Sequence, residues 1–315
     1  MTDSKLAFVF PGQGSQAVGM LDDLAAAFPL VRETFAEASA VLGYDLWSLT
    51  SDGPKEALDQ TEHTQPAMLT SSVAIWRCWQ TQGGQLPSVM AGHSLGEYSA
   101  LVCGGALEFA DAVALVAERA RLMQSAVPEG KGAMAALLGL DDQVVSTLCR
   151  EQAGNQVLEA VNFNAPGQVV IGGDRDAVER GIVAAKGVGA KRAIMLAVSV
   201  PSHCALMRDA ATALAARLTG IQVSMPAVEV LHNVSAGPAG STEELRSLME
   251  RQLFLPVRWV DAVRAMAERG VTTAIECGPG KVLAGLGKRI DKRIEFLPMF
   301  DADGLIKALE ATADA

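Results

Sequence analysis

Five apolar residues in a row, Leu6 to Phe10, lead directly into Pro11-Gly12 near the start of the sequence. A strand without polar alternation has no face suited to water, so both of its faces must be covered. Strands of this kind occur in parallel sheets that have helices on each side. Between residues 29 and 43, apolar side chains recur at spacings of four, three and four, which predicts a helix with one apolar face. The chain is therefore expected to fold as an α/β protein.

The middle of the chain has its own order of apolar and amphipathic segments, which predicts an inserted subdomain. Residues 132–196 alternate short apolar runs with amphipathic segments. The resulting split βαβ order is typical of a ferredoxin-like unit. We predict a small ferredoxin-like α+β subdomain at 128–198, inserted into a large, mostly parallel α/β domain formed by 1–127 and 199–315. The expected elements are strand 133–138, helix 141–149, strand 157–163, strand 168–171, helix 176–186 and strand 192–196.

Composition and charge narrow the range of functions. The sequence has 315 residues, of which 50% are hydrophobic and 20% charged, as is typical of globular enzymes. A formal charge of -10 opposes binding to nucleic acid, whose affinity depends on cationic contacts to phosphate. The five cysteines are scattered without a Cys-x-x-Cys pair, so we predict neither a disulfide framework nor a metal site. No apolar run reaches the ~20 residues of a membrane span, and we expect a cytoplasmic protein without a membrane partner.

The segment Gly92-His93-Ser94-Leu95-Gly96 fits the pattern Gly-x-Ser-x-Gly and lies between an apolar run and a helix expected at 100–107. In this motif the glycines allow a sharp turn between strand and helix that exposes the serine oxygen. Ser94 is therefore the candidate nucleophile, and the backbone N–H of Leu95 can stabilise an oxyanion. The alternative is an ordinary glycine-rich loop, because five-residue patterns also occur by chance.

A serine needs a base to take its proton at neutral pH, and the sequence offers four histidines. His93 adjoins the candidate nucleophile, and neighbouring side chains at a tight turn diverge, while His63 lies in a polar stretch. His203 follows an apolar run and a proline, so we expect it at a strand exit near a helix start, where α/β sheets gather active residues. Judged by position in the sequence alone, His203 is only a modestly better candidate base than His232. No acidic residue between Ser94 and His203 is an evident third member of a hydrolase-type catalytic triad. A backbone carbonyl suffices to orient the imidazole.

Arg119 lies on the flank of an apolar stripe in the helix predicted after Phe109, which aims its side chain near the interior. The planar fork of a guanidinium suits bidentate binding of a substrate carboxylate. A snorkelling surface residue or a structural ion pair explains the position equally well.

Separated motifs along the chain form a combination that is more specific than any one of them. These segments are Pro11-Gly12-Gln13-Gly14-Ser15-Gln16, Gly92 to Tyr98, Arg119, Val200-Pro201-Ser202-His203, Gln252 and Glu276-Cys277-Gly278-Pro279-Gly280. Together and in this order they resemble the malonyl-CoA:acyl carrier protein transacylases, an acyltransferase family of bacterial fatty-acid synthesis. The resemblance spans nearly the whole chain and implies an α/β-hydrolase-like large domain with a ferredoxin-like small one.

The resemblance also implies roles for single residues. Ser94 is implied to be the acylated nucleophile and His203 the general base, then acid. The backbone N–H groups of Gln13 and Leu95 are implied to form the oxyanion hole. Arg119 is implied to hold the malonyl carboxylate, and an acetyl group leaves that buried charge unpaired, which penalises the wrong substrate.

Further residues follow from the same resemblance. Gln252 is implied to support the site through hydrogen bonds, including a backbone carbonyl to the histidine. Asn162 matches a family asparagine near the site, although a turn or strand-end role fits it equally. Carrier proteins of this pathway are acidic, so basic clusters could dock them, with a solvated surface as the alternative. The clusters contain Lys191, Arg192, Lys288 and Arg289.

The implied reaction has two steps and ping-pong kinetics. Ser94 attacks the malonyl thioester and coenzyme A leaves; the phosphopantetheine thiol of acyl carrier protein then attacks the serine ester. Malonyl-CoA and acyl carrier protein are thus the expected partners, and no metal or cofactor is expected. A serine esterase shares the turn around Ser94 but prefers a carboxylate partner for histidine and has no need for Arg119. A non-catalytic scaffold that binds carrier protein is the third alternative.

Overall fold

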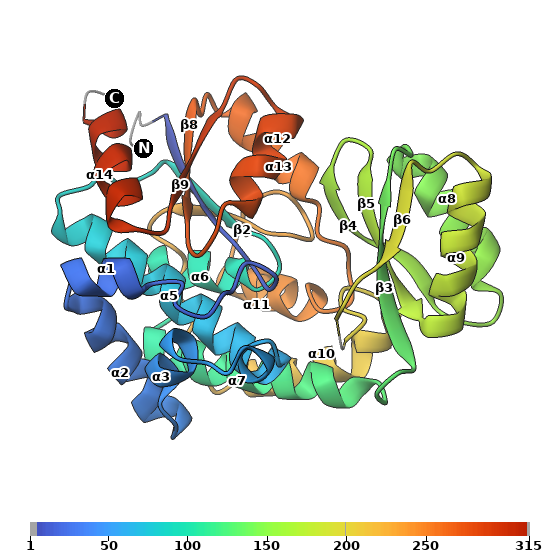
Figure 1. The fold of residues 1–315 in the computed structure, drawn as a ribbon, viewed down its shortest axis with the longest axis horizontal. Coiled ribbons are helices and arrows are strands. Elements are labelled where there is room, and N and C mark those ends of the chain that lie inside the picture. Colours follow the sequence, from blue (N-terminus) through green and yellow to red (C-terminus); the bar gives the residue numbers. More distant parts are fainter. Residues whose placement is uncertain (1–4, 199, 314–315) are drawn as a thin grey trace.

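The computed structural model describes residues 5–198 and 200–313 of the chain. Figure 1 shows a larger lobe, built from the beginning and the end of the sequence, beside a smaller lobe of green and yellow segments from its middle. Each lobe has a sheet of its own. Among the described residues, no helix combines the length and the apolar character that crossing a bilayer requires.

The sheet of the larger lobe has five strands in the order β7-β2-β1-β8-β9, and every neighbouring pair is parallel. The apolar run near the start of the chain forms its central strand, as the sequence predicts. Because all five strands point the same way, the loops that follow them meet along one edge. The strands are β1 (Leu6–Phe10), β2 (Val89–Gly92), β7 (Glu229–Leu231), β8 (Thr273–Cys277) and β9 (Glu295–Met299).

Both faces of this sheet are buried, which explains the lack of polar residues in β1. Successive side chains of a strand point to opposite faces. Phe8 and Phe10 therefore enter the core shared with α5 (Thr61–Thr81), α6 (Gly96–Cys103) and α7 (Phe109–Ala126), where Trp76 packs edge-on against Phe8 with ring centroids 5.0 Å apart. Ala7 and Val9 enter a second core shared with α12 (Trp259–Glu268) and α13 (Val282–Ile290). The sheet is thus sandwiched between two helical layers.

The helices of the larger lobe cover these two faces and lie around the sheet in Figure 1. They are α1 (Asp22–Ala27), α2 (Leu30–Leu42), α3 (Leu46–Ser51), α4 (Lys55–Leu58), α5 (Thr61–Thr81), α6 (Gly96–Cys103), α7 (Phe109–Ala126), η1 (Ala205–Met207), α10 (Arg208–Leu218), α11 (Thr242–Arg251), α12 (Trp259–Glu268), α13 (Val282–Ile290) and α14 (Ala302–Thr312).

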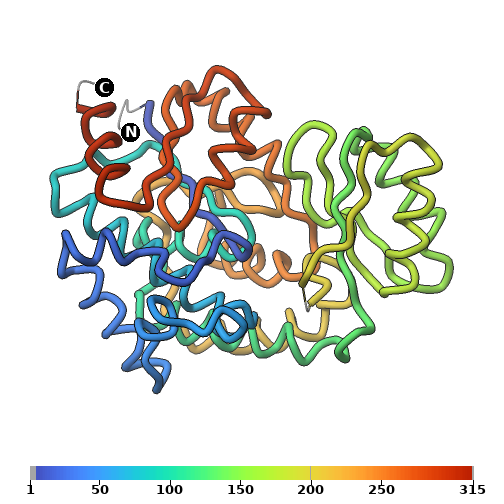
Figure 2. The backbone as a smooth tube through the Cα atoms, in the orientation of Figure 1, coloured from blue at the N-terminus to red at the C-terminus, as the bar shows by residue number. Residues whose placement is uncertain are grey.

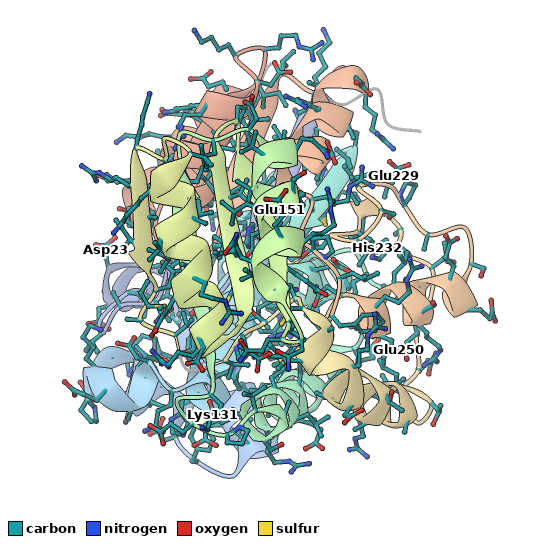
Figure 3. All side chains as sticks on the ribbon, turned by 90° about the vertical axis from the view of Figure 1, so that its right-hand side faces the viewer. Asp23, Lys131, Glu151, Glu229, His232 and Glu250 are labelled. Carbon is teal, nitrogen blue, oxygen red and sulfur yellow. The ribbon has the colours of Figure 1, made fainter. Side chains whose placement is uncertain are left out.

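The smaller lobe has an antiparallel sheet in the order β4-β5-β3-β6, with α8 and α9 packed together against it. Figure 3 looks onto this lobe, where the two helices lie in front of the sheet. The βαββαβ order confirms the ferredoxin-like prediction. The elements are β3 (Gly132–Leu138), α8 (Asp142–Ala153), β4 (Leu158–Ala165), β5 (Gln168–Asp174), α9 (Arg175–Gly187) and β6 (Arg192–Met195).

The two lobes are joined by backbone hydrogen bonds as well as by the chain. Figure 2, in the orientation of Figure 1, shows the green segment leaving the larger lobe after α7, and α10 lies again in the larger lobe. Phe163 of β4 donates to the carbonyl of Val257 at 3.0 Å, and Val257 donates back to Val161 at 2.9 Å. The boundaries at 127/128 and 198/199 stay a prediction, and residues 1–4, 199 and 314–315 of that prediction lie outside the described residues.

The sequence prediction misplaced one helix and missed another. The helix expected at 100–107 is α6, which begins at Gly96 and ends at Cys103. It stops early because Gly104-Gly105 follows, and Gly105 has a φ of 79° that a helix cannot continue. The sequence also gave no prediction for α5, which is buried along most of its length. Its first residues are polar and it contains Pro66, so its start has the composition of a loop.

Candidate active site

Ser94 lies on the sharp turn between β2 and α6. A Cβ atom at Gly92 would lie 1.9 Å from the carbonyl carbon of Gly96, and one at Gly96 would lie 2.0 Å from the carbonyl oxygen of Phe10. Only glycine fits either position, so the two glycines let strand and helix approach this closely. Ser94 itself has a φ of 51°. The turn therefore has the geometry that the Gly-x-Ser-x-Gly pattern predicts.

His203 approaches the serine from a distant part of the chain. Its Nε2 lies 2.7 Å from the Ser94 hydroxyl oxygen, and its Nδ1 lies 2.7 Å from the backbone carbonyl oxygen of Gln252. A carbonyl can only accept, so the Nδ1 atom carries the hydrogen and Nε2 presents its lone pair to the hydroxyl. The imidazole is thus set up to take the serine proton.

The location of His203 differs from the expected strand exit. In the described part of the chain, β6 ends at Met195 and belongs to the smaller sheet, and His203 lies in a loop just before η1. The backbone N–H of His203 donates to the carbonyl of Leu253 at 2.9 Å. The loop is therefore held by the segment after α11 rather than by the parallel sheet.

Strained backbone marks both residues. Among the described residues, only three that are not glycine have a positive φ, namely Ser94, His203 at 63° and Ala236. Each such conformation costs about 1–3 kcal/mol and persists only where the surroundings enforce it. The strain at Ser94 and His203 indicates that the fold holds these two side chains in a set geometry.

His203 is neutral in this environment. Its side chain is buried, with a relative exposure of 2%. Burial, together with the nearby charge of Arg119, lowers the pKa of His203 to about 3 from its ordinary 6.5. The imidazole therefore keeps its lone pair at neutral and mildly acidic pH.

This shift predicts a loss of stability in acid. Since the folded-state pKa lies below that of the unfolded chain, the unfolded state binds more protons between the two values. The free energy of unfolding is expected to fall as the pH drops below 6.5 toward 3. Urea titrations at several pH values measure this slope, which should be shallower in His203→Gln. Equal dependence of the unfolding free energy on pH in the two proteins would contradict the lowered pKa of His203.

Arg119 extends from α7 into the same site and is buried, with a relative exposure of 1%. Its Nη1 donates to Gln65 Oε1 at 2.7 Å and its Nη2 to Gln252 Oε1 at 3.0 Å. The guanidinium also lies over the Tyr98 ring, 5.3 Å from the centroid. Burial lowers the pKa of Arg119, but a guanidinium stays protonated in proteins. The site therefore contains a buried cation held by neutral amides.

Gln252 connects these groups and is fully buried. Besides its contacts to His203 and Arg119, its Nε2 donates to the carbonyl oxygen of Ser94 at 2.9 Å. Gln252 thus contacts the candidate nucleophile Ser94, the candidate base His203 and the candidate carboxylate-binding residue Arg119. The resemblance implied a supporting role for Gln252, and its contacts fit that role.

Two backbone N–H groups are available beside the serine. Within the described part of the chain, those of Gln13 and Leu95 donate to no protein acceptor. Leu95 stands at the start of α6, where the helix dipole favours negative charge. A Cβ at Gly12, next to Gln13, would lie 3.6 Å from the Leu95 nitrogen, so the two loops lie side by side. Their positions suit a developing oxyanion.

A buried network behind the turn holds Ser94 from the other side. Ser94 N–H donates to Asn233 Oδ1 at 2.7 Å, and Asn233 Nδ2 donates to the Gly92 carbonyl at 2.5 Å. Glu97 accepts from the Asn233 backbone N–H at 2.8 Å and lies 2.8 Å from His232 Nδ1. His232, the other candidate base, therefore pairs with Glu97 instead of the nucleophile. No role was predicted for Glu97, although it lies in the segment from Gly92 to Tyr98, and Asn233 was missed because no local pattern marks it.

Loss of the Asn233 side chain should destabilise the protein. Asn233→Ala leaves the Ser94 N–H and the Gly92 carbonyl without partners, and unpaired buried polar groups cost roughly 1–3 kcal/mol each. We expect the free energy of unfolding to fall by about 2–4 kcal/mol in urea titrations. The exposed Asn155→Ala is the matched control and should stay within about 0.5 kcal/mol of the wild type. Indistinguishable unfolding of the two variants would refute a supporting role for Asn233.

These groups line a pocket of about 190 Å³ between the lobes. The larger lobe contributes its polar and charged side, and the smaller lobe contributes an apolar wall and two asparagines. Asn162, at a β-bulge in β4, lines the pocket, and Asn164 Oδ1 lies 2.7 Å from His93 Nε2. The lining comprises Gln13, Thr61, Gln65, His93, Ser94, Leu95, Arg119, Met123, Met134, Asn162, Asn164, Val170, Leu196, Val198, Val200, Ser202 and His203.

The basic residues predicted to dock a carrier lie outside this pocket. Lys191 and Arg289, far apart in sequence, line one cavity of about 460 Å³ where the smaller lobe meets α13. Arg192 and Lys288 are their exposed neighbours in the chain. The structure therefore brings the two predicted clusters to a single seam.

Comparison with known proteins extends these observations. An acyl transferase domain family matches residues 7–295. The malonyl CoA-acyl carrier protein transacylase of Escherichia coli strain K12 is 56% identical over 307 residues, which cover 98% of this chain and 99% of the relative. The malonyl CoA-acyl carrier protein transacylase structure from Coxiella burnetii has a TM-score of 0.97 and 48% identity, covering 98% of each chain.

A second solved structure holds a carrier protein. This is a malonyl-transacylase, PlMCAT, in complex with its type II PKS acyl-carrier protein, AntF. It has a TM-score of 0.97 and 55% identity, and the match covers 98% of this chain and 100% of that one. On sequence, fold and coverage, the chain belongs to the malonyl CoA-acyl carrier protein transacylase family of acyl transferases.

Proposed function

We propose that this chain transfers a malonyl group from malonyl-CoA to the phosphopantetheine thiol of acyl carrier protein and so feeds fatty-acid biosynthesis. The observation that carries the proposal is the meeting of Ser94, His203 and Arg119 in one pocket. A nucleophile with its base can form an acyl ester, and a buried cation beside them selects an acyl group that bears a carboxylate.

In the first step the Ser94 oxygen attacks the thioester carbonyl while His203 Nε2 takes the hydroxyl proton. Negative charge develops on the carbonyl oxygen, and the N–H groups of Gln13 and Leu95 stabilise it. The carbon–sulfur bond then breaks, and the imidazolium returns its proton to the leaving coenzyme A thiolate. Malonyl remains on Ser94 as an ester, with its carboxylate on Arg119.

In the second step the nucleophile is the thiol of the carrier protein, whereas a hydrolase uses water at this point. His203 Nε2 takes the thiol proton as sulfur attacks the ester, and the same N–H groups stabilise the second oxyanion. The carbon–oxygen bond breaks and the imidazolium returns the proton to Ser94. The apolar wall of Met134, Val170 and Leu196 disfavours water near the ester, which a transferase must protect.

The hydrogen-bond partner of His203 separates this function from that of a serine esterase. A carboxylate at Nδ1 stabilises the imidazolium, whereas the Gln252 carbonyl only orients the ring. A thiol gives up its proton more readily than water does, so a base without a carboxylate partner suffices for the transfer to the carrier. Arg119 likewise has a role in binding malonyl and none in simple ester hydrolysis.

We expect the reaction to need no metal and no cofactor. Ser94 supplies the nucleophile, His203 moves the proton, and backbone N–H groups stabilise the charge, so each chemical role has a protein group. The described residues contain no group of three or more His, Cys, Asp or Glu arranged to hold a metal ion. Activity that persists after dialysis against a chelator is the corresponding measurement.

We place the reaction in the cytoplasm. All five cysteines are free thiols, and four of them are buried. Unpaired cysteines are typical of proteins from reducing compartments. Cell fractionation followed by an activity assay tests this location.

Intact-mass measurement tests the proposed function. The purified protein mixed with malonyl-CoA should gain one malonyl group, and added holo carrier protein should remove it and gain the same mass. Absence of the adduct would overturn the proposal. An adduct lost to water as fast as to the carrier would favour the esterase instead.

The seam formed by Lys191, Arg192, Lys288 and Arg289 is proposed to dock the acidic carrier protein. Lys191→Glu combined with Arg289→Glu should raise the KM for holo carrier about tenfold or more at low salt, because two attractive charges become repulsive. Loading from malonyl-CoA should be unchanged. Lys307→Glu on α14, exposed and in another part of the larger lobe, is the control. An unchanged KM in the double variant would refute this docking site.

A further inference from the structure

Gln65 is a buried polar residue with no role in the mechanism above. It lies in the first turns of α5, has a relative exposure of 1%, and lines the pocket that contains Ser94. Its Oε1 accepts from Arg119 Nη1 at 2.7 Å, while Gln252 Oε1 accepts from Arg119 Nη2 at 3.0 Å. Both terminal nitrogens of the guanidinium therefore already have an oxygen acceptor in the protein.

These two amide oxygens accept from the same two Nη atoms that a bidentate carboxylate can use. An arginine fork binds a carboxylate through two parallel N–H donors, and here each of the two Nη atoms donates to a different amide. A malonyl carboxylate that binds both Nη atoms therefore displaces one of these contacts or shares its donor, while Arg119 Nε, which has no protein acceptor among the described residues, is a further donor for it. A carboxylate is the stronger acceptor because the hydrogen bond is charge-assisted on both sides.

The two glutamines are not equally anchored. Gln252 also donates its Nε2 to the Ser94 carbonyl at 2.9 Å. Among residues 5–198 and 200–313, the Nε2 of Gln65 donates only to the Met123 sulfur, at 3.7 Å, and a thioether is a weak acceptor. Gln65 is therefore the amide that the substrate displaces at lower cost, and its released N–H₂ group can itself donate to the carboxylate.

We propose that Gln65 is a specificity-determining residue that acts as an internal competitor for the malonyl carboxylate on Arg119. This inference rests on the proposed function. It changes the origin of selectivity, because an acetyl group leaves Arg119 paired with Gln65 rather than unpaired. Discrimination then comes from the difference between a carboxylate and an amide as partner of the same guanidinium, and residue 65 sets that difference.

Two substitutions should move the selectivity in opposite directions. Gln65→Glu supplies a permanent carboxylate that outcompetes malonyl, so the ratio of malonyl to acetyl loading on Ser94 should fall by about 10²-fold. Gln65→Leu removes the competitor, so Nη1 gains an acceptor when malonyl binds and gains none when acetyl binds, and the ratio should rise about tenfold. Using the ratio cancels any common effect on the nucleophile.

The experiment measures initial rates of acyl-enzyme formation from malonyl-CoA and from acetyl-CoA by intact mass. Gln80→Glu, exposed on the same helix, is the control for an added carboxylate and should keep the wild-type ratio. Ratios that move in the same direction in both Gln65 variants, or that do not move, overturn the proposal. Should Gln65→Glu not fold, an unchanged ratio in Gln65→Leu alone overturns it. A wild-type protein that forms no malonyl adduct refutes the proposed function instead.

Discussion

Ser94→Ala is expected to abolish the malonyl adduct and to lower transfer to carrier protein by at least about 10⁴-fold, as removal of a serine nucleophile does in related chemistry. The hydroxyl lies 2.7 Å from His203 Nε2, and no other side chain is hydrogen-bonded to that nitrogen in the described part of the chain. Intact mass after incubation with malonyl-CoA measures the adduct, and a coupled assay with holo carrier measures the transfer.

A second pocket serine provides the control for this variant. Ser202 lines the same pocket, but its hydroxyl donates to the sulfur of Met134 at 3.5 Å and not to the base. Ser202→Ala should keep the adduct. Retention of the adduct in Ser94→Ala would end the acyl-serine mechanism.

Arg119→Ala is expected to lower malonyl loading by about 10²–10³-fold and acetyl loading far less, because it removes the buried cation that pairs with the substrate carboxylate. The ratio of malonyl to acetyl loading should therefore approach one. Initial rates of adduct formation from the two thioesters measure this ratio directly.

Arg121→Ala is the matched control for Arg119→Ala. It lies two positions further along α7, where its guanidinium is exposed and pairs with Glu118 at 2.5 Å. Its loss should leave both loading rates within a factor of about two, since exposed pairs contribute little. If Arg119→Ala keeps the wild-type ratio of malonyl to acetyl loading, the role of Arg119 in binding the malonyl carboxylate is refuted.

The fold was largely predictable because its strands and most of its helices carry local patterns. The apolar run of β1 and the alternation in residues 132–196 each identify an element within a short window. α5 has no such pattern, since it is buried all round and begins with polar residues whose partners lie elsewhere in the chain. Its assignment depends on tertiary contacts that a window of sequence does not contain.

The residues of the site likewise divide into those that a local sequence pattern marks and those that it does not. Ser94 carries a local signature, and Arg119 lies on an apolar helical face, but the expected location of His203 at a strand exit was wrong. The resemblance supplied Gln13, Gln252 and Asn162, whose catalytic roles stay predictions. Gln65, Glu97 and Asn233 contact residues 54, 135 and 139 positions away along the chain, so neither periodicity nor the motif that contains Glu97 could identify these contacts.

The orienting acceptor for the imidazole belongs to the main chain at position 252, and this fact bears on how such an enzyme can evolve. Whatever amino acid a codon at 252 specifies, the peptide oxygen is still there. The side chain of the same residue is buried and bonded to Arg119 and to the Ser94 carbonyl, so a substitution there changes those contacts. A missense change at this codon therefore alters the partners of the guanidinium and of the nucleophile's backbone without removing the acceptor that orients the imidazole.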